Sequence, residues 1–246
     1  KRYIKKIYQM SKISKISVVI PCYNEENTIS QVIIKVEKSL LNLNIDYEII
    51  VVDDHSTDDS SNKLIEFENQ KKIKLFTHSQ NFGKGAAIAT GLKNISGEII
   101  LIQDADLEYD PDDYKKLILP FYEANADVVY GSRFLGGGKY VRIHFFWHYV
   151  ANKILTLLCN MIANLNLTDM ETGYKLFRYE KIKDLKIKEK SFGFEPEITI
   201  KLAKKKSKFF EVPISYNGRS YKEGKKIGLK DAFVAVYCIF KYALKN

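Results

Sequence analysis

The chain has 246 residues, of which 46% are hydrophobic and 28% charged, as is usual for a globular protein. Its three cysteines, Cys22, Cys159 and Cys238, are far apart and form no Cys-x-x-Cys pair, which argues against a disulfide framework or a zinc site. The formal net charge of +9 indicates an anionic partner, such as nucleic acid, a phosphorylated substrate or a membrane surface. The basic segment 1–15 has no apolar core, so no signal peptide is expected.

Apolar, β-branched runs alternate with helical patterns through the first half of the chain. We predict strands at residues 16–20, 47–52, 73–76, 98–102 and 128–130. We predict helices at residues 28–41, 56–67, 84–92 and 111–123. Ser56 or Thr57 is the expected N-cap of the second helix. The alternation of helices with continuously apolar strands predicts an α/β fold with a mainly parallel central sheet covered on both faces.

From residue 143 the pattern changes to long apolar segments. Residues 143–165 are rich in aromatic side chains but also contain His148, Asn152 and Lys153, so they make a poor transmembrane span. This segment could form either a core helix or an amphipathic helix that lies on a membrane. Residues 229–244 form a similar but shorter pattern, and neither segment is long and apolar enough to cross a bilayer.

Four of the predicted strands end in polar residues. Ligands of parallel sheets bind beyond the carboxyl ends of the strands, so these ends predict one shared site. The four ends are Pro21–Glu25, Asp53–Ser56, Asp104–Glu108 and Gly131–Arg133.

Asp104 and Asp106 are the most informative pair among these ends. Alternate side chains of a strand share a face, so the two carboxylates could converge just beyond the strand 98–102. Two hard oxygen ligands suit Mg²⁺ or Mn²⁺, which completes its shell with phosphate and water. The alternative is a polar loop with two solvated aspartates.

Five further residues are candidates for binding a nucleotide or a phosphate. Asp53 is expected to contact the ligand, while Asp54, beside it, could do so or cap the next helix. Lys84 lies at a predicted helix N-terminus, where phosphate binds readily. Arg133 and Arg219 could bind phosphate bidentately or form structural ion pairs.

In their order and spacing these motifs resemble family 2 glycosyltransferases of the GT-A (Rossmann-like) fold. The resemblance is closest to the polyprenyl-phosphate (dolichyl-phosphate) mannose and glucose synthases, and it extends from Ser17 to about Phe240. The matching segments are residues 19–26, 51–54, 81–85, 103–108, 131–133 and 168–175.

The resemblance implies one GT-A domain over residues 16–246 after the basic segment 1–15. Residues 16–135 would be its nucleotide-sugar-binding half. Residues 136–246 would be its acceptor-binding, membrane-facing half, with C-terminal amphipathic helices.

The resemblance also implies a role for each matching residue. Residues that would bind the nucleotide are Pro21, Tyr23, Glu25, Asp53, Lys84, Asp104 and Ala105. Residues that would bind Mg²⁺ or Mn²⁺ are Asp104, Asp106 and Glu108, although relatives often carry glutamine at the last position. Asp106, Arg133 and Arg219 would be catalytic, the arginines binding the acceptor phosphate away from the metal carboxylates. Asp169, Glu171 and Glu195 would line the sugar and acceptor side.

The implied reaction is an inverting, metal-dependent transfer of a hexose from a UDP- or GDP-hexose to a polyprenyl (dolichyl or undecaprenyl) phosphate. The expected location is the cytoplasmic face of a membrane, with peripheral attachment and no nucleic-acid partner, since no binding motif for one is present. The alternative is a GT-A enzyme that glycosylates a saccharide hydroxyl. That reaction needs a general base, for which Asp169, Glu171 and Glu195 are candidates.

Overall fold

The structure is a computed structural model that describes residues 13–137, 142, 145–191, 193–219 and 229–244. The basic segment predicted at 1–15 lies almost wholly outside the described residues. The division of residues 16–246 into a nucleotide-binding and an acceptor-binding half stays a prediction.

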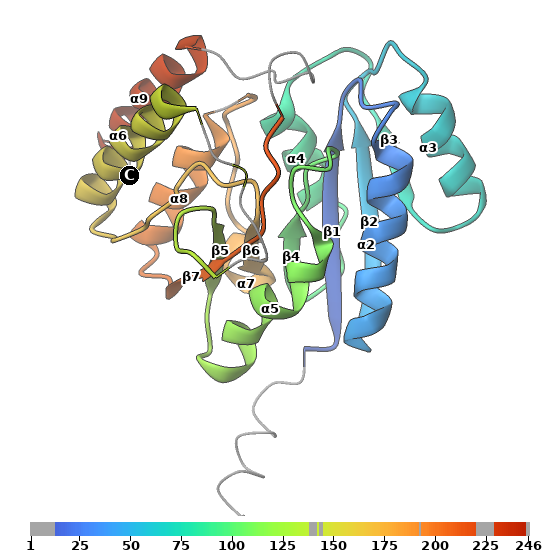
Figure 1. The fold of residues 1–246 in the computed structure, drawn as a ribbon, viewed down its shortest axis with the longest axis horizontal. Coiled ribbons are helices and arrows are strands. Elements are labelled where there is room, and N and C mark those ends of the chain that lie inside the picture. The colour runs from blue at the N-terminus through green and yellow to red at the C-terminus, as the bar shows by residue number, and fades with distance from the viewer. Residues whose placement is uncertain (1–12, 138–141, 143–144, 192, 220–228, 245–246) are drawn as a thin grey trace, which may run out of the picture.

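One seven-stranded sheet, in the order β3-β2-β1-β4-β6-β5-β7, forms the centre of the described chain (Figure 1). The strand β6 runs antiparallel to its neighbours β4 and β5, and the other strand pairs are parallel. The predicted mainly parallel sheet is therefore confirmed. The strands are β1 (Lys15–Cys22), β2 (Asp46–Asp53), β3 (Lys74–Thr77), β4 (Ile99–Ile102), β5 (Val128–Ser132), β6 (Lys175–Arg178) and β7 (Phe209–Pro213).

Successive residues of a strand point to opposite faces of the sheet. Because the strands are apolar at successive positions, both faces are apolar and helices cover both. Ile16 and Ile20 of β1 pack in one cluster with α2 and α5, whereas Val19 packs in a second cluster with α4, α6, α8 and α9. The helices are α2 (Ile29–Leu43), α3 (Ser60–Asn69), α4 (Lys84–Leu92), α5 (Tyr114–Glu123), α6 (Phe146–Ala163), α7 (Tyr179–Ile182), α8 (Phe194–Lys204) and α9 (Leu229–Leu244), with a 3₁₀ turn at Pro111–Asp113.

The predicted elements of the first half are confirmed to within a few residues, with one correction. The helix predicted at 56–67 begins only at Ser60, so neither Ser56 nor Thr57 is its N-cap. The backbone N–H of Ser56 instead donates to Asp53 Oδ1 at 3.0 Å, and its hydroxyl accepts from the N–H of Asn24 at 3.0 Å. These bonds hold residues 54–59, which connect β2 to α3, as a loop against the end of β1.

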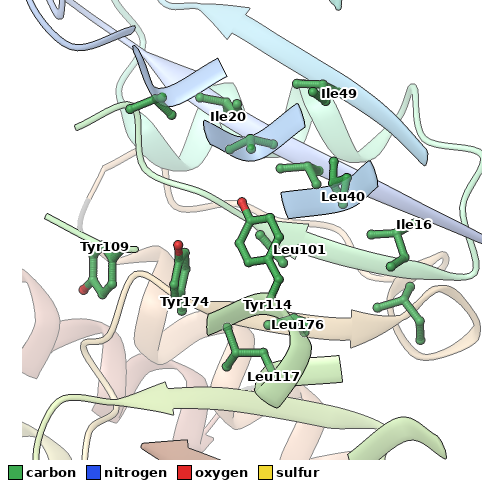
Figure 2. Packing of buried hydrophobic residues seen from close by; sticks show 14 of the residues in the cluster. Ile16, Ile20, Leu40, Ile49, Leu101, Tyr109, Tyr114, Leu117, Tyr174 and Leu176 are labelled. Atoms are coloured by element: carbon green, nitrogen blue, oxygen red, sulfur yellow. The ribbon is translucent and has the colours of Figure 1, made fainter. Parts of the chain in front are cut away.

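A group of buried tyrosines supports the turn that follows β4 (Figure 2). The hydroxyls of Tyr114 and Tyr174 donate to Oε1 of Gln103 at 2.7 and 2.8 Å. Tyr109 stacks on Tyr174 with ring centroids 4.7 Å apart, and its hydroxyl accepts from the N–H of Gly173 at 2.8 Å. Gln103 directly precedes the first predicted metal ligand, so these contacts fix the start of that turn.

The helices α6 and α9 lie side by side at one end of the molecule and are apolar on two sides (Figure 1). Their inner sides bury Leu155 and Ile239 against the sheet, while Trp147 and Phe233 on their outer sides are 77% and 76% exposed. The inner side of α6 belongs to the core, as the first of the two alternatives predicted, and the placement of α6 on a membrane stays a prediction. None of the helices in the described ranges has the length and apolarity needed to span a membrane.

Candidate active site at the carboxyl ends of the strands

A cavity of about 730 Å³ opens at the carboxyl ends of β1, β4 and β5 and extends to α6 and α9. The convergence predicted from the polar strand ends is therefore present in the structure. Predicted site residues on its wall are Pro21, Tyr23, Glu25, Lys84, Asp104, Ala105, Asp106, Glu108, Arg133, Glu171, Glu195 and Arg219. Asp53 and Asp169 are not on the wall.

Lys84 is held against Asp104 by the start of α4. Its Nζ lies 2.7 Å from Asp104 Oδ1 and 3.6 Å from Glu195 Oε1. Burial would lower the pKa of Lys84, but the charges of these two carboxylates outweigh burial and raise it. Gly83, with φ of +97°, turns the chain into the helix where any Cβ would collide with the carbonyl of Lys190. The turn therefore fixes the lysine at the ligand end of the sheet.

Arg219 binds three carboxylates that come from two different strand ends. Its Nη2 lies 2.7 Å from Asp106 Oδ2, its Nη1 lies 3.1 Å from Glu25 Oε2, and its Nε lies 3.3 Å from Glu108 Oε1. The expectation that both arginines lie away from the metal carboxylates is therefore wrong for Arg219. The physical reason is charge, because the guanidinium offsets the repulsion among three neighbouring carboxylates.

Asp106 and Glu108 have different surroundings. Burial and the neighbouring carboxylates raise the pKa of Asp106 to about 7. Both oxygens of Glu108 already accept hydrogen bonds, one from the Tyr216 hydroxyl at 2.6 Å and one from the N–H of Arg219 at 2.9 Å. Glu108 thus anchors residues 216–219 by hydrogen bonds. Its predicted role as a metal ligand stays a prediction. Across the described ranges, no group of three or more His, Cys, Asp or Glu residues is arranged to hold a metal.

Arg133 lies on the cavity wall and forms an ion pair with Asp169, which lies behind the wall. Its Nε and Nη2 donate to the two carboxylate oxygens at 2.7 and 2.8 Å, and the ring of Tyr216 lies 5.2 Å from the guanidinium carbon. Burial would raise the pKa of Asp169, but Arg133 holds it below its usual range. Asn152 of α6 donates to the same carboxylate at 3.2 Å. Asp169 thus orients an arginine and has no oxygen left for service as a general base.

Glu171, which is half-buried, and Glu195, which is buried, both line the cavity. Burial first, and then the charge of Glu195, raises the pKa of Glu171 to about 8. Lys175 lies behind them, where burial lowers its pKa to about 8 despite the surrounding carboxylates.

Asp54, rather than Asp53, contacts the cavity. Asp53 is 1% exposed and accepts hydrogen bonds from the N–H of Ser56 and the hydroxyl of Ser61. Asp54 accepts from the N–H groups of Phe82 and Gly83 at 2.9 and 2.6 Å. It therefore supports the turn into α4, and a role for Asp53 in binding the nucleoside stays a prediction.

Tyr109, Asn152 and Tyr216 also line the cavity, although we assigned them no role from the sequence. Asn152 could have been found as a polar residue on an otherwise apolar helix. Tyr109 and Tyr216 carry no such signal, since their contacts with Gly173 and Glu108 join segments far apart in the chain.

The family model for glycosyl transferase family 2 matches residues 17–186, which is more than half of the chain. The chain belongs to glycosyl transferase family 2. A dolichol-phosphate mannosyltransferase of Pyrococcus furiosus is 30% identical over 217 residues, covering 87% of this chain and 60% of its own length. The chain thus spans less than two thirds of this curated relative.

Solved structures confirm the predicted GT-A fold. Glucosyl-3-phosphoglycerate synthase from Mycobacterium tuberculosis, in complex with Mn²⁺, UDP and glucosyl-3-phosphoglycerate, superposes with a TM-score of 0.69 at 20% identity. The match covers 94% of this chain and 80% of the synthase. Mannosyl-3-phosphoglycerate synthase from Rubrobacter xylanophilus has a TM-score of 0.70 at 16% identity, covering 98% and 75% of the two chains.

Proposed function

We propose that this family 2 glycosyltransferase transfers a hexose from a nucleotide sugar to a polyprenyl phosphate. The observation that carries the proposal is the continuity of the cavity. It extends from the carboxylates after β4, past two arginines, to an apolar wall made by Leu155 of α6 and Ala235 of α9. A polar donor and an acceptor with an apolar chain could meet there. The name of the Pyrococcus relative, a dolichol-phosphate mannosyltransferase, supports this acceptor.

The donor end would bind a nucleoside diphosphate with Mg²⁺ or Mn²⁺. Asp104 and Asp106 offer hard oxygen ligands, and each already holds a cationic side chain at 2.7 Å, so the residues fit a divalent ion. When bound, the ion neutralises charge on the leaving diphosphate. Lys84 would stabilise the same phosphates. Residues expected around the nucleoside are Pro21, Tyr23, Glu25, Asp53 and Ala105.

The acceptor end would hold an anion that needs positioning more than activation. A lipid phosphate is already charged at neutral pH, so no general base has to remove a proton from it. Arg133 lies on the wall with its guanidinium oriented by Asp169. Arg219 would move from Asp106 to the acceptor phosphate once another cation neutralises that carboxylate.

The exposed apolar sides of α6 and α9 would lie against the cytoplasmic face of a membrane. Phe146, Trp147 and Met161 of α6, with Phe233 and Tyr237 of α9, are all more than half exposed. Such an arrangement is typical of peripheral attachment rather than of a span. The net charge of +9 favours an anionic lipid surface.

Labelled donors test this function directly. The protein is incubated with UDP- or GDP-linked glucose or mannose, a short polyprenyl phosphate, and Mg²⁺ or Mn²⁺. We expect a labelled lipid product that requires the metal and disappears in Asp104→Asn. The absence of metal-dependent lipid product with every donor would contradict the proposal.

A saccharide or other hydroxyl acceptor is the second candidate, and one observation favours it. Glu171 lies on the cavity wall with a pKa of about 8, which suits a general base. The two solved synthases are named for transfer to phosphoglycerate. In this case Glu171→Gln abolishes transfer but keeps donor binding, and Arg219→Ala has little effect. With a lipid phosphate, Arg219→Ala lowers transfer about a hundredfold.

A further inference from the structure

His78 directly follows β3 and forms a hydrogen bond through each nitrogen of its ring. Nδ1 lies 2.6 Å from Oδ1 of Asp54, and Nε2 lies 2.8 Å from the hydroxyl oxygen of Thr90 in α4. The side chain is 12% exposed, and the backbone N–H of His78 donates to the carbonyl oxygen of Asp53 at 2.9 Å. The ring is therefore held between the end of β2 and α4.

The two partners determine how the ring of His78 is protonated. The carboxylate of Asp54 only accepts hydrogen bonds, so Nδ1 carries a proton and donates to it. In the neutral ring Nε2 then accepts from the hydroxyl of Thr90, and in the charged ring it donates to the same oxygen. In both states His78 donates to Asp54.

Asp54 connects this ring to the turn that precedes α4. Its Oδ1 also accepts from the N–H of Phe82 at 2.9 Å, and its Oδ2 accepts from the N–H of Gly83 at 2.6 Å. The ring of Phe82 packs edge-on against that of His78, with the centroids 5.3 Å apart. Asp54 is 2% exposed, so the loss of one donor from its carboxylate would be costly. His78 therefore helps to fix the orientation of the group that binds the turn.

The next residue along the chain, Lys84, extends from this turn into the cavity at the carboxyl ends of the strands. Its Nζ lies 2.7 Å from Oδ1 of Asp104. His78 is not on the wall of that cavity and instead lines another one, of about 380 Å³, between α4 and residues 187–190. Any effect of His78 on a ligand of the first cavity must therefore pass through Asp54 and the turn.

We propose that His78 is a positioning residue that holds Lys84 at the phosphates of the donor. The assignment rests on the proposed function for the role of Lys84, and it adds the residue that keeps this lysine in place. A charge-assisted hydrogen bond to phosphate needs the ammonium group at a fixed distance and direction. Thr90 orients the ring, and Asp54 transmits its position to the turn.

A double-mutant cycle between His78 and Lys84 tests the assignment without any acceptor. Isothermal titration with Mn²⁺ present measures the affinities of UDP and GDP for the wild type, His78→Leu, Lys84→Met and the double variant. For the preferred diphosphate we expect Lys84→Met to weaken binding by about thirtyfold and His78→Leu by about tenfold. In the Lys84→Met background the change at His78 should cost less than about twofold, because no ammonium group remains to be misplaced.

Three further variants separate positioning from general damage. In His78→Asn the side-chain amide can still donate to Asp54, so the affinity should stay within about twofold of the wild type. The exposed Gln80→Leu, in the same loop, should bind the diphosphate as the wild type does. Thr90→Val removes the hydroxyl that orients the ring, and we expect a loss of about threefold that disappears in the Lys84→Met background. It supplies the same cycle if His78→Leu does not fold.

Three results would overturn the assignment. One is an equal loss of affinity from His78→Leu with and without Lys84, another is wild-type affinity in His78→Leu, and the third is a His78→Asn variant as weak as His78→Leu. Wild-type affinity in Lys84→Met would contradict the phosphate role of Lys84 in the proposed function, and the assignment would fail with it. Absence of a lipid product alongside the expected cycle would contradict only the proposed acceptor, and the positioning role of His78 would be supported.

Discussion

Glu48 at one end of the sheet and Glu171 with Glu195 at the other differ in how many hydrogen-bond donors they have. At the amino ends of β1, β2 and β4, Glu48 is surrounded by donors. It accepts from the Ser17 hydroxyl at 2.5 Å and from the N–H of Ser96 at 2.6 Å, and it pairs with Lys74 at 2.7 Å. At the carboxyl ends, Glu171 and Glu195 each keep an oxygen without a donor.

The pKa values follow this contrast. Burial would raise the pKa of Glu48, but the hydrogen bonds from Lys74, Ser17 and Ser96 lower it to about 2. The pKa of Glu171 rises to about 8, because burial and a neighbouring carboxylate act in the same direction. Carboxylates whose oxygens accept several hydrogen bonds stabilise the fold, whereas cleft carboxylates with raised pKa values are candidates for the functional site. Substitutions at the two ends should therefore separate stability from activity.

The largest effect is expected at the carboxyl end, in Asp106→Asn. Transfer should fall by about a thousandfold, because charge on the leaving diphosphate loses its proposed metal ligand. The free energy of unfolding should change by less than about 1 kcal/mol, because Arg219 keeps Glu25 and Glu108 as partners. Labelled-sugar transfer and urea unfolding measure the two quantities. Activity within tenfold of the wild type would remove Asp106 from the proposed machinery.

Two glycine substitutions provide a matched pair. In Gly97→Ala the new Cβ would lie 2.6 Å from the Ser17 nitrogen and force open the Glu48 cluster, so we expect about 3 kcal/mol less stability with normal activity per folded molecule. In Gly173→Ala the Cβ would collide with Asp104, and transfer should fall about a hundredfold. Thermal unfolding and transfer assays are run on both variants. The comparison is contradicted if Gly97→Ala loses mainly activity and Gly173→Ala loses mainly stability.

Glu48→Gln should reduce stability by about 2 kcal/mol without reducing activity. The amide keeps the shape of the side chain but loses the charge-assisted bonds to Lys74 and the two serines. The control is Glu180→Gln, whose exposed pair with Lys183 should contribute less than about 0.5 kcal/mol. Urea unfolding at pH 7 measures the free energy of unfolding of both variants. Equal losses would show that the hydrogen bonds to Glu48 contribute no more to stability than an exposed ion pair.

The smallest effect is a pH dependence. The pKa of Glu48 is lowered from 4.5 to about 2 in the folded protein, so its contribution is fully present above pH 4.5 and is lost as the pH falls towards 2. The wild type should therefore lose its advantage over Glu48→Gln between pH 6 and pH 3, by about 1 kcal/mol after allowance for solvent screening. Urea unfolding at both pH values measures the difference. A difference that grows on acidification would have the wrong sign.

The sequence predicted the first half of the fold because mostly apolar strand segments alternate there with helical patterns. The strands β6 and β7 were missed because they lie beyond this regular alternation and carry charged residues, such as Arg178 and Glu211. The positions of Asp104, Lys84 and Arg133 were predictable, since each residue lies at the end of a strand or the start of a helix. Their partners were not, because Asp169 lies 36 residues after Arg133 and Arg219 lies 194 residues after Glu25.

The place of β6 in the sheet has a consequence for synthesis of the protein on the ribosome. The strand β5 reaches the rest of the sheet only through β6, which follows it after a long interval that includes α6. When residues 128–132 leave the exit tunnel, the edge of β4 that will receive β6 is still open. The growing chain therefore exposes an unpaired strand edge until residues 175–178 emerge, and a chaperone would protect it best during that interval.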